Sequence, residues 1–291
     1  MLQRSAEWNR TRATSVTASG CSAVLDLSPW ISRKDYLEQK AFESVYGVGP
    51  RPSNVAMEDG IMWEPAVIEM SKPFVLGFNP NLYYADNSGK AVNGVSTEYQ
   101  RHPEIPFLGA SPDKLVYDRS VAVPVQRQDG LFDYRDLLVS GLEVKKQFRM
   151  SKRGPEAWFP CKEVVYNYWC QCQLSMEVFD VPHWDFFVVG QQITSDETLP
   201  DGSPSHVAAW SQGERVYRDK QWFEDSLVEF VKFMDELEAT IAELKASETG
   251  GEPCPTIPIM PAPEVSRAAH IEGEWDGVIE DEEWDGVIED I

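Results

Sequence analysis

GASPDKLVYD (Gly109–Asp118) and GLEVKKQF (Gly141–Phe148) are the two segments from which the expected fold is built. Asp113 follows a proline at a turn and leads into a short β-prone run that can pair with the second segment. Successive side chains of a strand point to opposite faces, so Glu143 and Lys145 share one face of the second strand. Two carboxylates and a lysine are therefore expected to meet at one end of a hairpin.

This combination of side chains suits metal-dependent chemistry. Carboxylate oxygens are the ligands that Mg²⁺ prefers, and a neighbouring ammonium can orient a water molecule or hold a phosphate oxygen. The order Pro-Asp, a gap, then Glu-x-Lys resembles the signature of the PD-(D/E)xK nuclease superfamily. A solvated turn beside a charged strand face is the alternative interpretation of the same pattern.

The composition is that of a folded globular protein. The chain has 291 residues, 42% of them hydrophobic, which allows one large domain or two small ones. No apolar run approaches the roughly 20 residues that a membrane span needs, and the first ten residues lack the apolar core of a secretion signal. The five cysteines fit neither a disulfide framework nor a zinc site. Reduced thiols and a cytoplasmic location are expected.

The formal net charge of −22 restricts how the chain could bind nucleic acid, because phosphates are neutralised by Lys and Arg. Residues 264–291 contribute eleven acidic residues and one arginine, so the remainder stays acidic. DNA would have to be held by local basic clusters, namely Arg4, Arg10, Arg12, Lys145, Lys146, Arg149, Lys152 and Arg153.

Hydrophobic spacing predicts helices and strands in alternation. Helices are expected at Lys34–Val45, Asn54–Lys72, Cys161–Phe179 and Gln221–Lys245. Pro65 lies inside the second of these, which predicts a kink or a helix start near Glu64. Extended segments are expected at Phe74–Tyr84, Ser96–Gln100, Trp184–Val189 and, as an edge strand, Val207–Ala209. Arg119–Leu138 is interpreted as a polar insertion.

These elements predict one α/β domain over residues 1–246. The fold class expected is the PD-(D/E)xK, restriction-endonuclease-like core, a central mixed β-sheet flanked by helices. Residues 247–291 change in composition to a Pro/Gly linker followed by an acidic repeat, which predicts a disordered tail.

Four further positions are candidates for the same site. Glu64 ends a G-x₃-E pattern on the second predicted helix, and Gln171 lies in Y-x₂-Q-x-Q on the third. Arg12 and Ser19 could together form a phosphate pocket from a guanidinium and a hydroxyl. Taken singly, each has an ordinary structural interpretation, such as a surface glutamate, a helix-flank amide, a surface arginine or an N-cap serine.

Five motifs in one order resemble the phage lambda exonuclease family, also called YqaJ-type viral recombinase nucleases. They are W-x₃-R-x₄-T-A-S (Trp8 to Ser19), G-x₃-E (Gly60 to Glu64), S-P-D (Ser111–Asp113), G-L-E-x-K (Gly141–Lys145) and Y-x₂-Q-x-Q (Tyr168–Gln173). The resemblance covers about residues 7–246. Three features depart from it: the wide gap between Asp113 and Glu143, the acidic charge and the tail.

The resemblance implies a Mg²⁺-dependent exonuclease that degrades one strand of double-stranded DNA from the 5′ end, in viral or phage-type recombination. Asp113, Glu143 and the carbonyl of Val144 would bind the first metal ion. Glu64 would complete a site for a second ion, and Mn²⁺ could replace Mg²⁺. Two ions that stabilise the attacking and leaving oxygens are a common solution for phosphodiester hydrolysis.

The remaining site residues receive roles by the same resemblance. Lys145 would position or activate the attacking water, and Gln171 would support the nucleophile or the scissile phosphate. Arg12 and Ser19 would hold the 5′-phosphate and so set polarity and processivity. Implied partners are double-stranded DNA ends, a single-strand annealing protein and two further copies of the chain in a trimeric ring.

Two other functions fit the same residues. A structure-specific endonuclease of the superfamily would cut closed circular duplex, which an exonuclease leaves intact. If the protein is instead a non-catalytic DNA-binding recombination scaffold, Glu143→Ala and Lys145→Ala would leave its biochemical phenotype unchanged.

The C-terminus contains a tandem repeat, EWDGVIEDE at Glu274–Glu282 and EWDGVIEDI at Glu283–Ile291. Acidic stretches with interspersed Trp, Val and Ile resemble partner-docking peptides in composition. The repeat could occupy a basic groove or recruit the annealing partner, or it could simply be a solubilising tail. Unchanged DNA affinity and partner binding after deletion of residues 264–291 would exclude docking.

Overall fold

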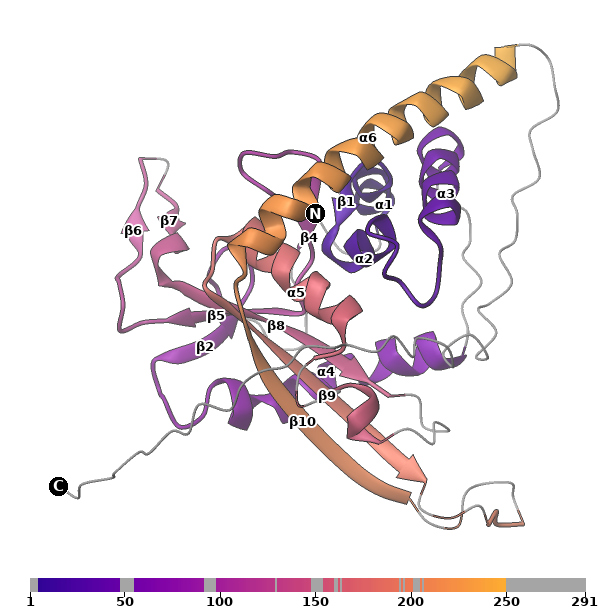
Figure 1. Ribbon diagram of the computed structural model, residues 1–291. Helices are drawn as coiled ribbons and strands as arrows, with labels where there is room; N and C mark the ends of the chain where they lie inside the picture. The colour runs from indigo at the N-terminus through magenta and orange to yellow at the C-terminus, as the bar shows by residue number, and fades with distance from the viewer. Residues whose placement is uncertain are drawn as a thin grey trace, which may run out of the picture.

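The structure of the chain is a computed structural model, shown in Figure 1. It describes residues 5–47, 55–91, 98–128, 130–147, 154–159, 164–193, 197–200 and 207–249, and the single positions 162, 195 and 205.

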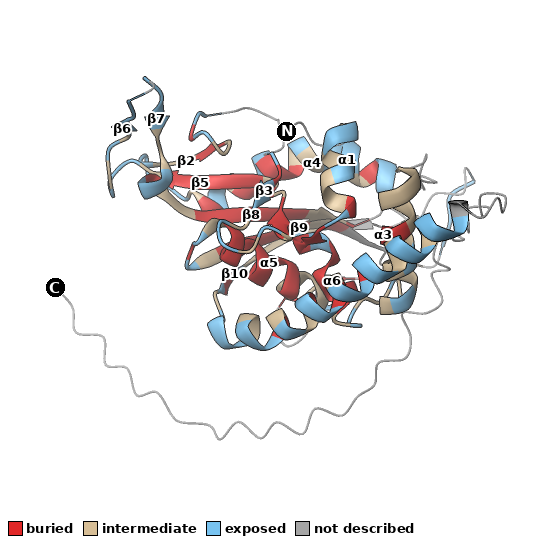
Figure 2. Ribbon diagram, turned by 90° about the horizontal axis from the view of Figure 1, so that it is seen from above, coloured by how far each residue is buried: buried red, intermediate tan, exposed pale blue. Residues whose placement is uncertain are grey.

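A five-stranded mixed sheet runs through the centre of the protein (Figure 1). In spatial order its strands are β10 (Val207–Tyr217), β9 (His183–Ile193), β8 (Leu138–Lys146), β5 (Lys114–Asp118) and β2 (Leu82–Ala85). The β8–β9 pair is parallel and the other three pairs are antiparallel. The central strands are almost wholly buried, as Figure 2 shows, because helices lie against the sheet. The expected α/β fold class with a central mixed sheet is confirmed.

Each face of the sheet packs against one helix, and the alternation of side chains determines what each helix meets. On one face, α4 (Val55–Val75) buries Val67 and Ile68 against Leu142 and Val144 of β8. On the other face, α5 (Tyr166–Phe179) packs against strand residues that include Leu115, Trp184 and Phe186. Glu143 and Lys145 alternate with Leu142 and Val144, so they lie on the α5 face. The predicted sharing of one face by Glu143 and Lys145 is confirmed.

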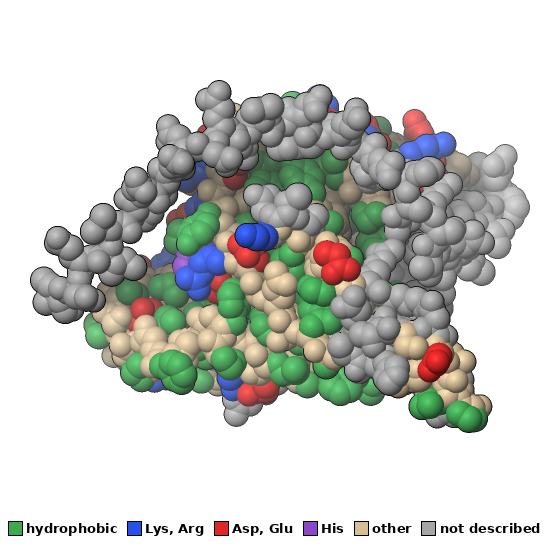
Figure 3. All heavy atoms as spheres, turned by 60° about the horizontal axis from the view of Figure 1, so that its bottom comes forward, with side chains coloured by type: hydrophobic (Ala, Val, Ile, Leu, Met, Phe, Trp, Pro, Cys, Tyr) green, Lys and Arg blue, Asp and Glu red, His purple; other side chains and the backbone are tan. Residues whose placement is uncertain are grey.

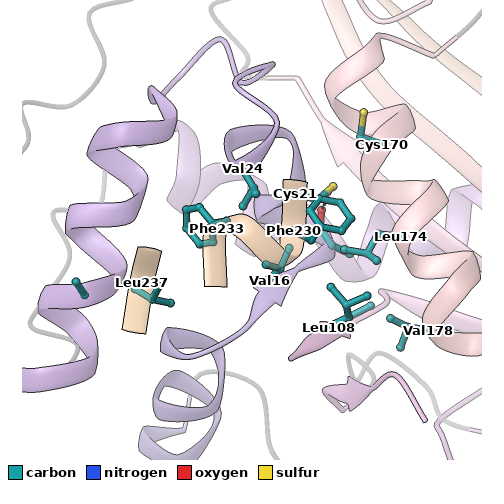
Figure 4. Close-up of a cluster of buried hydrophobic side chains, with 13 residues drawn as sticks. Val16, Cys21, Val24, Leu108, Cys170, Leu174, Val178, Phe230, Phe233 and Leu237 are labelled. Atoms are coloured by element: carbon teal, nitrogen blue, oxygen red, sulfur yellow. Dashed lines mark hydrogen bonds between the residues drawn. The ribbon is translucent and has the colours of Figure 1, made fainter. Parts of the chain in front are cut away.

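A second layer of helices covers α5 on the side away from the sheet. It consists of α2 (Cys21–Val24), α3 (Arg33–Tyr46) and the long α6 (Lys220–Thr249). Figure 4 shows the apolar cluster that unites them, in which Phe230, Phe233 and Leu237 of α6 point toward the N-terminal segment. Full burial of large apolar side chains of this kind is the main stabilising term in folding.

The N-terminal segment is held beside the S-P-D turn by a small sheet. It comprises β1 (Val16–Thr17), β4 (Leu108–Ala110) and β3 (Gln100–Arg101). β1 pairs parallel with β4, with Val16 opposite Leu108 and Thr17 opposite Gly109. Two paired parallel strands run in the same direction, so the segments that follow them leave the sheet at the same end. The η1 turn (Ala18–Gly20) and the turn at Ser111–Asp113 therefore lie on the same side.

Several sequence-based boundaries need correction. α4 continues through Pro65 as far as Val75, so no helix starts near Glu64, and the predicted extension over Phe74–Tyr84 is wrong except at its end. The packing of α4 on the sheet outweighs the one hydrogen bond that an internal proline removes. Two further bounds are shifted, since α5 begins only at Tyr166 and β10 extends to Tyr217. The structure also contains α1 (Ala6–Ala13), a helix that the sequence did not predict.

The insertion between β5 and β8 is less polar than expected. It contains β6 (Val125–Gln126) paired with β7 (Phe132–Asp133), then the short η2 (Arg135–Leu137). Several of its apolar side chains are exposed, namely Val121, Val123, Val125, Leu131 and Phe132. The η3 turn (Pro155–Ala157) precedes α5 in the chain.

Parts of the sequence-based interpretation fall outside the described residues. They include the first two residues of Ser96–Gln100, the basic residues Arg4, Arg149, Lys152 and Arg153, and the whole acidic repeat. Among the residues that the structure does describe, no helix combines the length and the apolar character that crossing a membrane requires.

Candidate active site

The first part of the site is the junction of β5 and β8. The backbone N–H of Asp113 donates to the carbonyl of Leu142 at 3.2 Å, which begins the antiparallel ladder between the two strands. Two residues further along β8, the backbone N–H of Val144 donates to Oδ2 of Asp113 at 2.7 Å. The aspartate side chain thus continues the ladder beyond the point where β5 begins.

The direction of the Val144 carbonyl follows from this bond. In a strand the N–H and C=O of one residue point to the same neighbour, and successive residues alternate. The backbone groups of Leu142 and Val144 point toward β5. In contrast, the backbone N–H of Gln147 points toward β9, where it donates to the carbonyl of Val189 at 2.9 Å. The Val144 carbonyl is therefore directed to the same edge as the Asp113 carboxylate.

Glu143 and Lys145 form the second part of the site. Their side chains make an ion pair between Oε1 of Glu143 and Nζ of Lys145. Glu143 is 4% exposed, and the Lys145 side chain is 25% exposed and so is reached by solvent. The Lys145 ammonium also lies 5.2 Å from the ring centroid of Tyr168 on α5, within the range of a cation–π contact. Sequence reasoning assigned Tyr168 no role.

The electrostatics of these groups are coupled. Burial first, and then the Glu143 carboxylate, raise the pKa of Asp113, against the opposing effects of Lys145 and the Val144 N–H. Burial alone would lower the pKa of Lys145, but the carboxylates of Glu143 and Asp113 outweigh it, and the net change is upward. Lys145 is consequently a charged donor at neutral pH. Two acidic side chains crowded together in this way are the usual setting for a bound cation.

Gln171 and Glu64 lie on the two helices that pack against opposite faces of the sheet. Gln171 is 8% exposed and lies one turn after Tyr168 on the same face of α5. Glu64 lies on α4 and is half-buried, and its charge contributes to raising the pKa of Asp113. Across the described part of the chain, no three His, Cys, Asp or Glu side chains are grouped closely enough to hold one ion. A second ion bound through Glu64 therefore stays a prediction.

The donor set suits a hard divalent cation. It offers one carboxylate each from Asp113 and Glu143 and the carbonyl of Val144, and Mg²⁺ typically keeps several waters in its remaining positions. A cation would also relieve the repulsion that raises the pKa of Asp113. On these two grounds the residues fit the implied metal.

Arg12 and Ser19 come together as the sequence predicts. Nη2 of Arg12 donates to Oγ of Ser19 at 2.9 Å, and the guanidinium carbon lies 4.1 Å from the ring centroid of Trp8. Both residues line a small polar pocket of about 150 Å³. Lys40 of α3 lines it too and was not identified from the sequence.

A direct hydrogen bond joins this pocket to the S-P-D turn. Nε1 of Trp8 donates to Oγ of Ser111 at 3.2 Å, so the indole contacts Arg12 on its face and the turn at its edge. Asp113 is two residues beyond Ser111. Trp8 and Ser111 appear in the sequence motifs, but nothing in the sequence indicates that they touch.

The described part of one face of the molecule shows no extended basic patch. Figure 3 shows the face at the bottom of Figure 1, where charged side chains occur in small groups in which basic and acidic ones adjoin, among apolar side chains. Anionic ligands would therefore be held by individual cations.

Comparison with known proteins gives one family and several similar structures. The family model described as "YqaJ-like viral recombinase domain" matches residues 7–182. An alkaline exonuclease from Laribacter hongkongensis, LHK-Exo, has 21% identity and a TM-score of 0.56, and the match covers 85% of this chain and 100% of that one. A structure of LHK-Exo in complex with dAMP matches with 22% identity, a TM-score of 0.56 and the same coverage. No curated protein matches the chain.

Proposed function

The chain belongs to the YqaJ-like viral recombinase domain family, and on that premise we propose that it is a Mg²⁺-dependent exonuclease that degrades one strand of double-stranded DNA from the 5′ end. The observation that carries the proposal is the meeting of Asp113, Glu143 and Lys145 at the junction of β5 and β8. The exonuclease activity named for LHK-Exo, whose fold is similar, agrees with it.

In this proposal Asp113, Glu143 and the Val144 carbonyl hold the metal ion. When bound, the ion would polarise the scissile phosphate and make an attacking water nucleophilic at neutral pH. Asp113 is oriented for this role by the Val144 N–H, which donates to one of its carboxylate oxygens. Glu143 is held by Lys145 on the neighbouring position of the same face.

Lys145 acts as a cationic donor rather than as a base. Because its pKa is raised, the ammonium keeps its proton at neutral pH and orients a water or a phosphate oxygen by hydrogen bonding. Gln171, on the same helix face as Tyr168, would add a neutral amide on the α5 side of the reacting phosphate. Glu64 would serve a second ion from α4, on the opposite face of the sheet, and its charge acts on Asp113.

The pocket of Arg12 and Ser19 would select the DNA end. A guanidinium and a hydroxyl at hydrogen-bond distance offer several donors to a terminal phosphate, which carries more charge than an internal one. A 5′-phosphate held there would direct the following phosphodiester toward Asp113 by way of the Ser111 turn. This arrangement would account for polarity.

The decisive experiment is digestion of three DNA forms by purified protein. Linear duplex with 5′-phosphate ends, the same duplex with 5′-hydroxyl ends, and closed circular duplex are incubated with Mg²⁺ or with a chelator. We expect mononucleotide release from linear DNA only, in Mg²⁺ only, and faster from phosphorylated ends. Glu143→Gln is the inactive control. Cutting of the circular duplex would favour an endonuclease. If linear DNA stays intact in Mg²⁺, the non-catalytic DNA-binding scaffold is the function that remains.

The proposed partners need separate tests. A homotrimer predicts three times the chain mass of 32.9 kDa by light scattering. An annealing protein as partner predicts co-purification that is lost on deletion of residues 264–291.

A further inference from the structure

Lys40 is a buried lysine on α3 whose ammonium contacts the N-terminal region. It is 4% exposed, and its Nζ donates to the carbonyl of Ser15 at 2.7 Å and to the carbonyl of Arg12. The same ammonium lies 5.3 Å from the ring centroid of Tyr36, one turn earlier on α3. A buried charge is costly unless it is well compensated, so its presence calls for a reason.

The two carbonyls belong to the end of α1 and the residue that leads into β1. The last carbonyls of a helix lack partners inside the helix and carry its negative dipole end, so an ammonium placed there is favourable. The Arg12 carbonyl also accepts the Ser15 N–H at 3.3 Å. The Thr14 N–H donates to it as well, so three donors on one carbonyl fix the backbone of Arg12 where its side chain departs.

The Arg12 side chain then reaches Ser19 from this fixed backbone. The pocket that both line also contains Lys40 and Glu43, which lies one turn before the end of α3. Glu43 would oppose binding of an anion. With Arg12 and Lys40 both cationic, the pocket keeps a net positive charge.

The wall of the pocket at Gly20 is closely packed. A Cβ at Gly20, which also lines it, would lie 2.0 Å from Oη of Tyr36. The ring of Tyr36 in turn stacks on Phe233 of α6 at 5.8 Å between centroids. Lys40 therefore connects the pocket to the packed helical layer.

We propose that Lys40 is a positioning residue for recognition of the DNA 5′-phosphate, holding the Arg12 backbone and offsetting the charge of Glu43. The inference rests on the proposed function of the Arg12–Ser19 pocket. Lys40 does not contact the scissile phosphodiester in this account, and it acts through Arg12.

The test compares Lys40→Met with Lys34→Met in the full-length protein. Lys34 lies on the same helix with its side chain 82% exposed, so its removal controls for loss of one charge on α3. Affinity for a short duplex with a 5′-phosphate or a 5′-hydroxyl is measured by fluorescence anisotropy in chelator, and initial digestion rates are measured in Mg²⁺. For Lys40→Met we expect the phosphate-to-hydroxyl ratio to fall about tenfold in both assays, the equivalent of ~1.4 kcal/mol. Lys34→Met should keep the wild-type ratio.

An unchanged ratio in Lys40→Met would overturn the inference, as would equal losses on both kinds of end. If Lys40→Met does not fold by circular dichroism, Lys40→Gln replaces it, since glutamine keeps a donor and loses the charge. Wild-type protein that digests linear duplex without preferring phosphorylated ends overturns the role of Lys40 and leaves the nuclease intact. Wild-type protein that prefers phosphorylated ends in the anisotropy assay but digests nothing supports the pocket and rejects the nuclease.

Discussion

The backbone N–H of Val144 and the side chain of Asp113 make a 2.7 Å hydrogen bond across the start of the β5–β8 ladder. The bond places an acidic side chain where a backbone carbonyl of β5 would otherwise stand. The Asp113 carboxylate and the Val144 carbonyl consequently share one edge, and Glu143 stands between the two strand positions that face β5. The predictions about catalysis start from this arrangement.

Asp113→Asn should abolish digestion and stabilise the metal-free protein. Burial and the Glu143 charge raise the pKa of Asp113, so the folded protein holds this proton to higher pH than the unfolded chain does. The contribution of Asp113 to stability is therefore present below its ordinary pKa and is lost as the pH rises through the raised value. Asparagine does not ionise, so no stability is lost as the pH rises. Its side-chain oxygen can still accept the hydrogen bond from the Val144 N–H. In chelator at pH 8 we expect a Tm increase of roughly 2–4 °C, the shift that ~1 kcal/mol produces at this chain size. The gain should shrink toward pH 4, and a gain that grows at low pH would contradict the prediction.

Lys145→Met and Lys146→Met should affect different properties although the residues are adjacent. Lys145 pairs with Glu143 on the α5 face, whereas Lys146 pairs with the buried Asp59 of α4 on the other. Loss of the Lys145 donor should lower kcat by about 10²-fold or more, and it should also lower Tm because it leaves the buried Glu143 carboxylate without its cation. Loss of Lys146 leaves Asp59 without its cation and should cost ~3 kcal/mol of stability. Single-turnover digestion and thermal unfolding separate the two effects, and equal kinetic losses in both variants would argue against distinct roles.

Trp8→Phe and Trp8→Ala should weaken the link between the pocket and the S-P-D turn to different degrees. Phenylalanine keeps an aromatic face for Arg12 but loses the Nε1 donor to Ser111. A single hydrogen bond of this kind contributes ~0.5–1.5 kcal/mol, so preference for phosphorylated ends should fall about threefold to tenfold. Alanine removes the cation–π contact as well and should reduce the preference further. The measurement is the ratio of digestion rates on the two kinds of end, and an unaltered ratio in both variants would show that the contact has no part in recognition.

Gly141→Ala and Gly60→Ala should change stability in opposite directions. A Cβ at Gly141 would lie 2.2 Å from the indole of Trp184, which is fully buried. Overpacking of this kind costs ~1–3 kcal/mol, and it would displace β8 next to Glu143. A Cβ at Gly60 on α4 would meet nothing within 4 Å, and alanine there should add roughly 0.5–1 kcal/mol by helix propensity. Denaturant unfolding measures both. Destabilisation by Gly60→Ala would show that this glycine is required by more than helix geometry.

Much of the fold follows from periodicity. The apolar stripe of α6 is visible in the sequence because it reports a single buried face. The helical nature of α1 is not visible, since this helix buries only Ala13 and so has no apolar stripe. The continuity of α4 through Pro65 likewise depends on its packing against the sheet, which no local pattern records.

By itself the sequence determined which side chains share a strand face and which motifs occur in order, because both are properties of neighbouring positions. It thereby placed Glu143 with Lys145 and named Asp113, Arg12 and Ser19 as candidates. Only the tertiary structure decided that Trp8 touches Ser111, 103 residues away, and that Lys40 lies buried beneath the carbonyl of Arg12. Contacts of this kind arise from the parallel pairing of β1 with β4 and from the docking of α3 on α6, and burial of a lysine is paid for by partners that are distant in the chain.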